Sequence, residues 1–225
     1  MGAGPLGVCR DREAQRLTTT MAETLRARYA ALPGSTHIAS AFACAGLAVW
    51  LDRRRPRYVY EAGGGIGTLS LVALTALREF DVPRLQYQME ERDPWCLTQW
   101  KNHIGPLASE GVVLTTEWIA PRQPFDFVIL DGPSGPYWEW LAHRAVIFVE
   151  GNRRPQRAAL EAVLRGRRGL CRAHWKPQDR SKGYWVYQLD PTRLELLRCL
   201  AVRLRETLRD GFGRLSGRAL GKKRR

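Results

Sequence analysis

A carboxylate stands beside a glycine-rich turn within the segment Tyr58–Leu74, "YVYEAGGGIGTLSLVAL". Glu61 ends an apolar run, and three glycines follow it at alternate positions: Gly63, Gly65 and Gly67. Glycine adopts positive φ and has no Cβ, so a ligand can approach its backbone closely. The dinucleotide fingerprint G-x-G-x-x-G does not fit, because Thr68 or Ser70 would stand at its third glycine. An acid beside the turn favours a cationic ligand and would repel a pyrophosphate.

Two further acids follow strand-like runs. In "LQYQMEERDP", Glu91 ends the run, with Glu90 as an alternative one position earlier. Asp93 is expected to cap a helix that begins at Pro94. In "FDFVILDGP", Asp131 comes directly after an apolar run. Ligands of open α/β sheets bind outside the carboxyl ends of the strands, so we expect these acids to face a ligand.

These motifs resemble those of class I S-adenosylmethionine-dependent methyltransferases, nearest to the small O-methyltransferase-like branch, over roughly residues 35–190. The resemblance implies that S-adenosylmethionine is the cofactor. It implies that Glu91 accepts hydrogen bonds from the ribose hydroxyls and that Arg92 lies beside the adenine. It also implies that Glu117 and Trp118, which end the third strand, contact the adenine. The implied cofactor residues are Glu61, Gly63, Gly65, Gly67, Glu91, Arg92, Glu117, Trp118 and Asp131.

The resemblance leaves two catalytic schemes open. One subgroup of O-methyltransferases holds magnesium with an Asp after the fourth strand and an Asp-Asn pair after the fifth. Asp131, Glu150 and Asn152 take those places here, but a glycine splits the pair and two arginines follow it. We therefore predict no metal ligand and favour a metal-free site, with magnesium kept as the alternative. In the metal-free scheme a side-chain base removes the acceptor's proton.

The metal-free scheme makes Asp131 and His143 the catalytic candidates. His143 follows a cluster of aromatic residues that either wall an acceptor pocket or pack a helix onto the sheet: Tyr137, Trp138 and Trp140. His37 precedes the glycine turn and is a further candidate for the acceptor site.

Elements that could position these residues alternate along the chain. Strands are predicted at "YVYEA", "LQYQM", "GVVLTTEW", "FDFVIL", "AVIFVE", "LCRAHW" and "YWVYQL", with helices between most of them. The pattern predicts an α/β fold: a doubly wound, mostly parallel, seven-stranded Rossmann-like sheet that ends in an antiparallel hairpin. We expect a helical extension at 1–34, a cofactor-binding domain at 35–190, and a helix with a basic tail at 191–225.

Composition constrains the partners. The 225 residues carry a net charge of +14, and the five cysteines include no CxxC pair, which predicts a reducing, cytoplasmic setting without disulfides. No apolar run is long enough for a membrane helix, so no membrane partner is expected. The leading hypothesis is methyl transfer to a small-molecule acceptor, oxygen before nitrogen. The charge and the terminal "GKKRR" keep RNA or a ribosomal component as the alternative. An aminopropyltransferase and a non-catalytic binding module are less favoured, and the oligomeric state is open.

Overall fold

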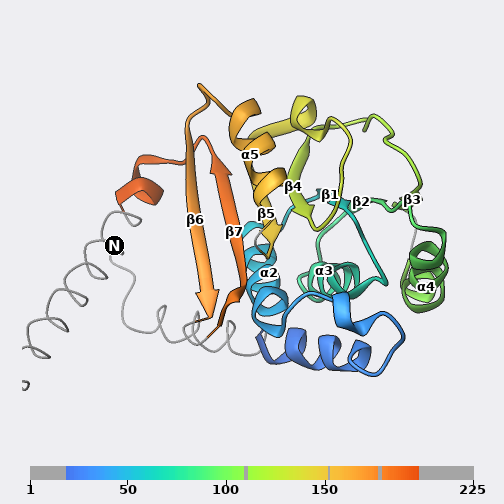
Figure 1. The fold of residues 1–225 in the computed structure, drawn as a ribbon. Coiled ribbons are helices and arrows are strands. Elements are labelled where there is room, and N and C mark those ends of the chain that lie inside the picture. The colour runs from blue at the N-terminus through green and yellow to red at the C-terminus, as the bar shows by residue number, and fades with distance from the viewer. Residues whose placement is uncertain (1–18, 109–110, 152, 177–178, 198–225) are drawn as a thin grey trace, which may run out of the picture.

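The computed structural model describes residues 19–108, 111–151, 153–176 and 179–197, and its strands form one sheet (Figure 1). The strand order is β3-β2-β1-β4-β5-β7-β6. The first five are parallel, and β7 is antiparallel to both β5 and β6, which confirms the predicted sheet and its terminal hairpin. The strands are β1 (Tyr58–Ala62), β2 (Gln86–Glu90), β3 (Val112–Thr115), β4 (Phe125–Leu130), β5 (Leu141–Glu150), β6 (Gly169–Lys176) and β7 (Asp179–Leu189).

Helices cover both faces of the sheet (Figure 1). The longer helices are α2 (Ala41–Arg54), α3 (Thr68–Glu79), α4 (Pro94–Ile104) and α5 (Arg154–Val163). Three short 3-10 turns are η1 (Ser35–His37), η2 (Gly105–Leu107) and η3 (Tyr137–Trp140). Residues 19–29 are also helical, and no helix in the described ranges is long and apolar enough to cross a membrane.

Successive side chains of a strand point to opposite faces of the sheet, so the core has two layers, one on each face. Val59 of β1 belongs to a cluster of buried side chains that includes residues of α2, α3, α4 and the helix at 19–29. Tyr60, one position later, points to the opposite face and packs with η3 and α5. Because the N-terminal helix contributes Ala22 and Tyr29 to the first layer, residues 19–29 share a core with the sheet. The C-terminal helix is described only over 193–197, so the rest of the expected helix and the basic tail lie outside the described residues.

The region before β5 differs from the prediction. The expected helix around "YWEWLAH" is the single turn η3, and β5 already begins at Leu141. Phe125 of β4 pairs with Leu141, but Phe127 pairs with Val146, so β5 bulges between these points. Arg144 lies in the bulge with a φ of 66°. An irregular strand of this kind does not show the period-two pattern by which strands are found in sequence.

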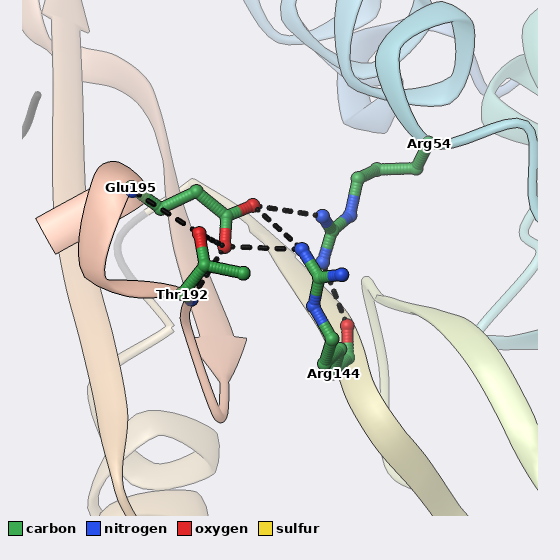
Figure 2. Close-up of polar contacts among 4 residues, drawn as sticks. All are labelled: Arg54, Arg144, Thr192 and Glu195. Carbon is green, nitrogen blue, oxygen red and sulfur yellow. Dashed lines mark hydrogen bonds and ion pairs between the residues drawn. The ribbon is translucent and has the colours of Figure 1, made fainter.

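The bulge at Arg144 is held by a polar cluster, drawn in Figure 2. Arg54, at the end of α2, donates from Nη2 to the carbonyl of Arg144 at 2.7 Å. Both guanidiniums reach the carboxylate of Glu195, at 3.2 Å from Arg54 and 3.1 Å from Arg144. Thr192 and Glu195 form a capping box, because the Thr192 hydroxyl and amide donate to Glu195 and the Glu195 amide donates back. The cluster ties the segment after β7 to α2 and β5.

Candidate active site

The glycine turn lies between β1 and α3 and presents open backbone. A Cβ on Gly63 would come within 2.5 Å of the Gly132 backbone, so the turns after β1 and β4 touch. Gly65 has a φ of 52°, and a Cβ there would meet nothing within 4 Å. The Gly65 backbone therefore faces free space that a ligand can enter. The close contact between Gly63 and Gly132 holds the turn in place and so determines the position of the Gly65 backbone.

Glu61 supports the turn from beneath. Its side chain is fully buried, and its Oε2 accepts hydrogen bonds from the hydroxyls of Ser70 and Tyr87, each at 2.5 Å. Trp100 Nε1 donates to Ser70 at 2.8 Å and extends the network into α4. Burial raises the pKa of Glu61 to about 7, although the two hydroxyls lower it. Within the described residues Oε1 has no hydrogen-bond partner. Glu61 thus belongs to the layer under the turn and does not line the crevice.

Glu90, the alternative acid at the end of β2, is saturated by protein donors. It is 1% exposed. Its Oε2 accepts from the Tyr60 hydroxyl at 2.6 Å and the Gly135 amide at 3.3 Å. Its Oε1 accepts from Nε and Nη2 of Arg92 at 3.0 and 2.6 Å. A carboxylate has about four acceptor positions, so Glu90 has none left for a ligand. Arg92, expected beside an adenine, here folds back onto Glu90.

Glu91 keeps one acceptor position free. Its Oε2 accepts from the amide of Gly65 at 2.7 Å, and its Oε1 accepts from the amides of Arg92 and Asp93 at 2.8 and 2.9 Å. Asp93 in turn accepts from the amide of Cys96 at 2.8 Å, which confirms it as the N-cap of α4. Glu91 therefore joins the glycine turn to the start of α4 and remains partly exposed.

A cavity of about 110 Å³ lies beside this turn. Its lining includes Gly34, Ile38, Gly65, Thr68, Trp95 and Asp131. Thr68 is 4% exposed, and its hydroxyl has no partner in the described part of the chain. Trp95 packs against Gly34, where an added Cβ would lie 2.6 Å from the indole, so α4 and the segment before α2 meet over the cavity. Neither Thr68 nor Trp95 was predicted from the sequence, although both directly follow predicted motifs.

At the other side of the crevice, Asp131 forms an ion pair with Arg153. Nη2 of Arg153 donates to Asp131 Oδ1 and lies 3.8 Å from Glu150 Oε2. Burial, and then the neighbouring Glu150, raise the pKa of Asp131 well above its usual range, against the opposing effect of Arg153. Burial also raises the pKa of Glu150. Two carboxyl groups with raised pKa values therefore share one guanidinium.

Magnesium does not fit this arrangement. A guanidinium already pairs with the two acids that would have to bind the ion. No group of three potential ligands from His, Cys, Asp and Glu occurs within the described residues. Asn152, the third expected ligand, lies outside them.

The two histidine candidates lie in different places. His143 is on the amino-terminal part of β5, with Nδ1 3.2 Å from Asp190 and a side chain that is 78% exposed. Asp131 follows the carboxyl end of β4, so the structure does not bring His143 to it. His143 and Asp131 were the catalytic candidates predicted from the sequence, but β5 begins at Leu141 and places His143 near its amino end. His37 ends η1, between the cavity-lining Gly34 and Ile38.

The aromatic candidates pack onto the sheet. Tyr137 is 3% exposed and stacks on Tyr60, with 5.9 Å between ring centroids. Trp118 meets Tyr60 edge-on at 5.3 Å. These rings, with the half-buried Trp138 and Trp140, belong to the second core layer and do not line the cavity. Glu117 is exposed beside them. The packing interpretation of the aromatic cluster therefore fits the structure better than a pocket wall.

The sequence matches no family model and no curated protein. The structure does match solved structures. An O-methyltransferase from Bacillus cereus in complex with SAH aligns with a TM-score of 0.54 at 15% identity, over 77% of this chain and 90% of that one. The SAH-bound methyltransferase PaMTH1 from Podospora anserina aligns with a TM-score of 0.55 at 11% identity, over 85% and 98%. The O-methyltransferase TomG from Streptomyces achromogenes, involved in tomaymycin synthesis and in complex with SAM, aligns with a TM-score of 0.51 at 14% identity, over 77% and 90%.

The chain has the fold of these methyltransferases. Its glycine turn, Glu91 and Asp131 lie at the carboxyl edge of the sheet, where ligands of this type of fold bind.

Proposed function

We propose that the protein is an S-adenosylmethionine-dependent methyltransferase that acts on a small-molecule acceptor, with oxygen favoured over nitrogen. One observation carries this proposal: the cavity is bounded by the open backbone of Gly65 on one side and by the carboxylate of Asp131 on the other. The names of the structural neighbours support it.

The residues around the cavity fit this cofactor. The unpartnered hydroxyl of Thr68 and the open space at Gly65 are features that a bound ligand would complete. Typical ligand pockets measure about 300–1,000 Å³, so this smaller cavity would hold one end of a longer molecule. The rest would continue past Gly65 to Glu91, whose free acceptor position suits a ribose hydroxyl. Asp131 is the one charged residue of the cavity lining, and an acid at this place suits a cationic ligand. When bound, the cofactor supplies an electrophilic methyl group.

Asp131 is the proposed catalytic residue. Its carboxylate lies at the carboxyl end of β4 and lines the cavity, so it can accept a hydrogen bond from an acceptor hydroxyl and hold that oxygen in line. Its raised pKa brings it closer to the range in which a carboxylate removes a proton effectively. We do not propose a role for His143 in this step, because it lies on the amino-terminal part of β5.

RNA remains the alternative acceptor, favoured by the net charge of +14. The cavity lining is not basic, since the only charged side chain among its residues is Asp131. The charge is therefore spread over other parts of the chain.

A labelling experiment tests the proposal. The full-length protein is incubated with S-adenosylmethionine carrying a tritiated methyl group, and with either a panel of phenols, catechols and hydroxy acids or total RNA. We expect label in at least one small molecule, and at least about a hundredfold less for Asp131→Asn. Label in RNA alone would contradict the small-molecule assignment.

A further inference from the structure

We propose that the guanidinium of Arg153 serves as a built-in cation between Asp131 and Glu150, in the place where a related enzyme would hold a divalent metal ion. The inference deepens the proposed function and rests on it for its catalytic meaning. The contacts among Arg153, Asp131 and Glu150 support the inference whichever acceptor is methylated.

The fold brings these three side chains together. β4 and β5 are neighbouring parallel strands, and Leu130 pairs with Val149. Asp131 and Glu150 are the next residues along each strand, so their carboxylates reach the same edge of the sheet. Arg153 follows three residues after Glu150, at the N-cap of α5, and its side chain turns back to both acids.

Arg153 places a positive charge between the two acids, as a bound metal ion would. Two carboxylates at one edge of a sheet repel each other unless a cation lies between them. Arg153 supplies that charge. A divalent ion would have to displace the guanidinium from Asp131 and would then lie beside its positive charge, which is unfavourable.

The remaining donors of Arg153 give it a second task. Its ion pairs use Nη2 only, and Nε and Nη1 form no hydrogen bond within the described residues. The Arg153 side chain is 35% exposed, so a ligand can approach it. Nε and Nη1 can hold an oxygen of the acceptor next to Asp131, as a metal ion would hold it. Arg153 is thus a positioning residue for Asp131 and a binding residue for the acceptor.

The neighbouring arginine provides a matched control. Arg154 begins α5 and is exposed, and its side chain has no hydrogen bond or ion pair within the described residues. Its removal changes the local charge by the same amount as the removal of Arg153. A difference between the two variants therefore reports on the position of Arg153 and not on net charge.

The test measures binding of Mn²⁺, a spectroscopically visible divalent ion, to the untagged full-length protein by electron paramagnetic resonance. We expect no saturable site in the wild type, Arg153→Lys or Arg154→Met. Arg153→Met should gain one saturable Mn²⁺ site, because two free carboxylates suit a hard cation. Adding Asp131→Asn to Arg153→Met should remove that site.

Two results would overturn the inference. One is a saturable Mn²⁺ site in the wild type with the affinity of Arg153→Met. The other is a folded Arg153→Met that gains no site, with Arg153→Gln as the second variant if the first does not fold. Binding of S-adenosylhomocysteine is measured on the same samples. If the wild type did not bind S-adenosylhomocysteine, this would count against the proposed function. The Mn²⁺ result would still decide the role of Arg153.

Discussion

Gly63 and Gly132 meet backbone to backbone across the carboxyl ends of β1 and β4. A Cβ on Gly132 would lie 2.7 Å from the Cα of Gly63, and one on Gly63 would lie 2.5 Å from the backbone of Gly132. The amide of Asp131, one residue earlier, donates to the carbonyl of Ala62 at 2.9 Å. The turn beside the proposed cofactor and the carboxylate beside the proposed acceptor are therefore parts of one packed unit.

Gly132→Ala should force apart the turns that follow β1 and β4. We expect the free energy of unfolding to fall by at least about 2 kcal/mol, because backbone and not a flexible side chain blocks the new methyl group. Gly105→Ala is the control, since Gly105 has helical φ and open space around it. Urea unfolding of both variants gives the comparison, and equal stability would show that the close approach is unimportant.

Glu91→Ala should weaken binding of S-adenosylhomocysteine at least about tenfold, because a hydrogen bond to a charged group contributes about 1.5–3 kcal/mol. Glu90→Ala should instead lower stability by about 2–4 kcal/mol, since it leaves the buried Tyr60 hydroxyl and Gly135 amide without an acceptor. Calorimetry and urea unfolding separate the two effects. A larger loss of affinity for Glu90→Ala, at equal folded fraction, would assign the ribose to Glu90.

Glu61 should make stability depend on pH. Its pKa is raised from 4.5 to about 7, so the native state binds more protons than the unfolded state between these values. The stability that comes from the neutral carboxyl is present below about pH 4.5 and is lost as the pH rises through about 7. Glu61→Gln cannot ionise and should lose less stability between pH 5 and pH 8.5 than the wild type, by up to about 3 kcal/mol. The free energy of unfolding is measured with urea at several pH values. If it changed with pH equally in the wild type and in Glu61→Gln, this role of Glu61 would be excluded.

Glu195→Ala should lower stability without affecting the site. It removes the acceptor for Arg54 and Arg144 and half of the capping box with Thr192 (Figure 2). We expect a loss of about 1–2 kcal/mol in urea unfolding and an unchanged affinity for S-adenosylhomocysteine. A change in affinity at constant stability would mean that this cluster communicates with the crevice.

Local patterns made most of the fold predictable. The apolar runs at β1, β4 and β7 and the cap at Asp93 each follow from neighbouring residues, and the structure confirms them. The positions of Gly63, Gly65, Glu91 and Asp131 at one edge follow from the rule that parallel strands share a carboxyl end.

Long-range contacts explain what the sequence did not predict. His143 lies away from Asp131 because it is on the amino-terminal part of β5, before Arg144 of the bulge. Arg144 contacts Arg54 and Glu195, which are remote in sequence. The ion pair of Arg153 with Asp131 joins residues 22 positions apart, and a sequence pattern shows only that Arg153 follows Glu150.

Calorimetric titration of the wild-type protein with S-adenosylhomocysteine and, separately, with NAD⁺ tests the central claim most directly. The account predicts one equivalent of S-adenosylhomocysteine bound, weakened by Glu91→Ala, and no heat from NAD⁺. Binding of NAD⁺ without any response to S-adenosylhomocysteine would contradict the assignment of the glycine turn, and with it the proposed methyl transfer.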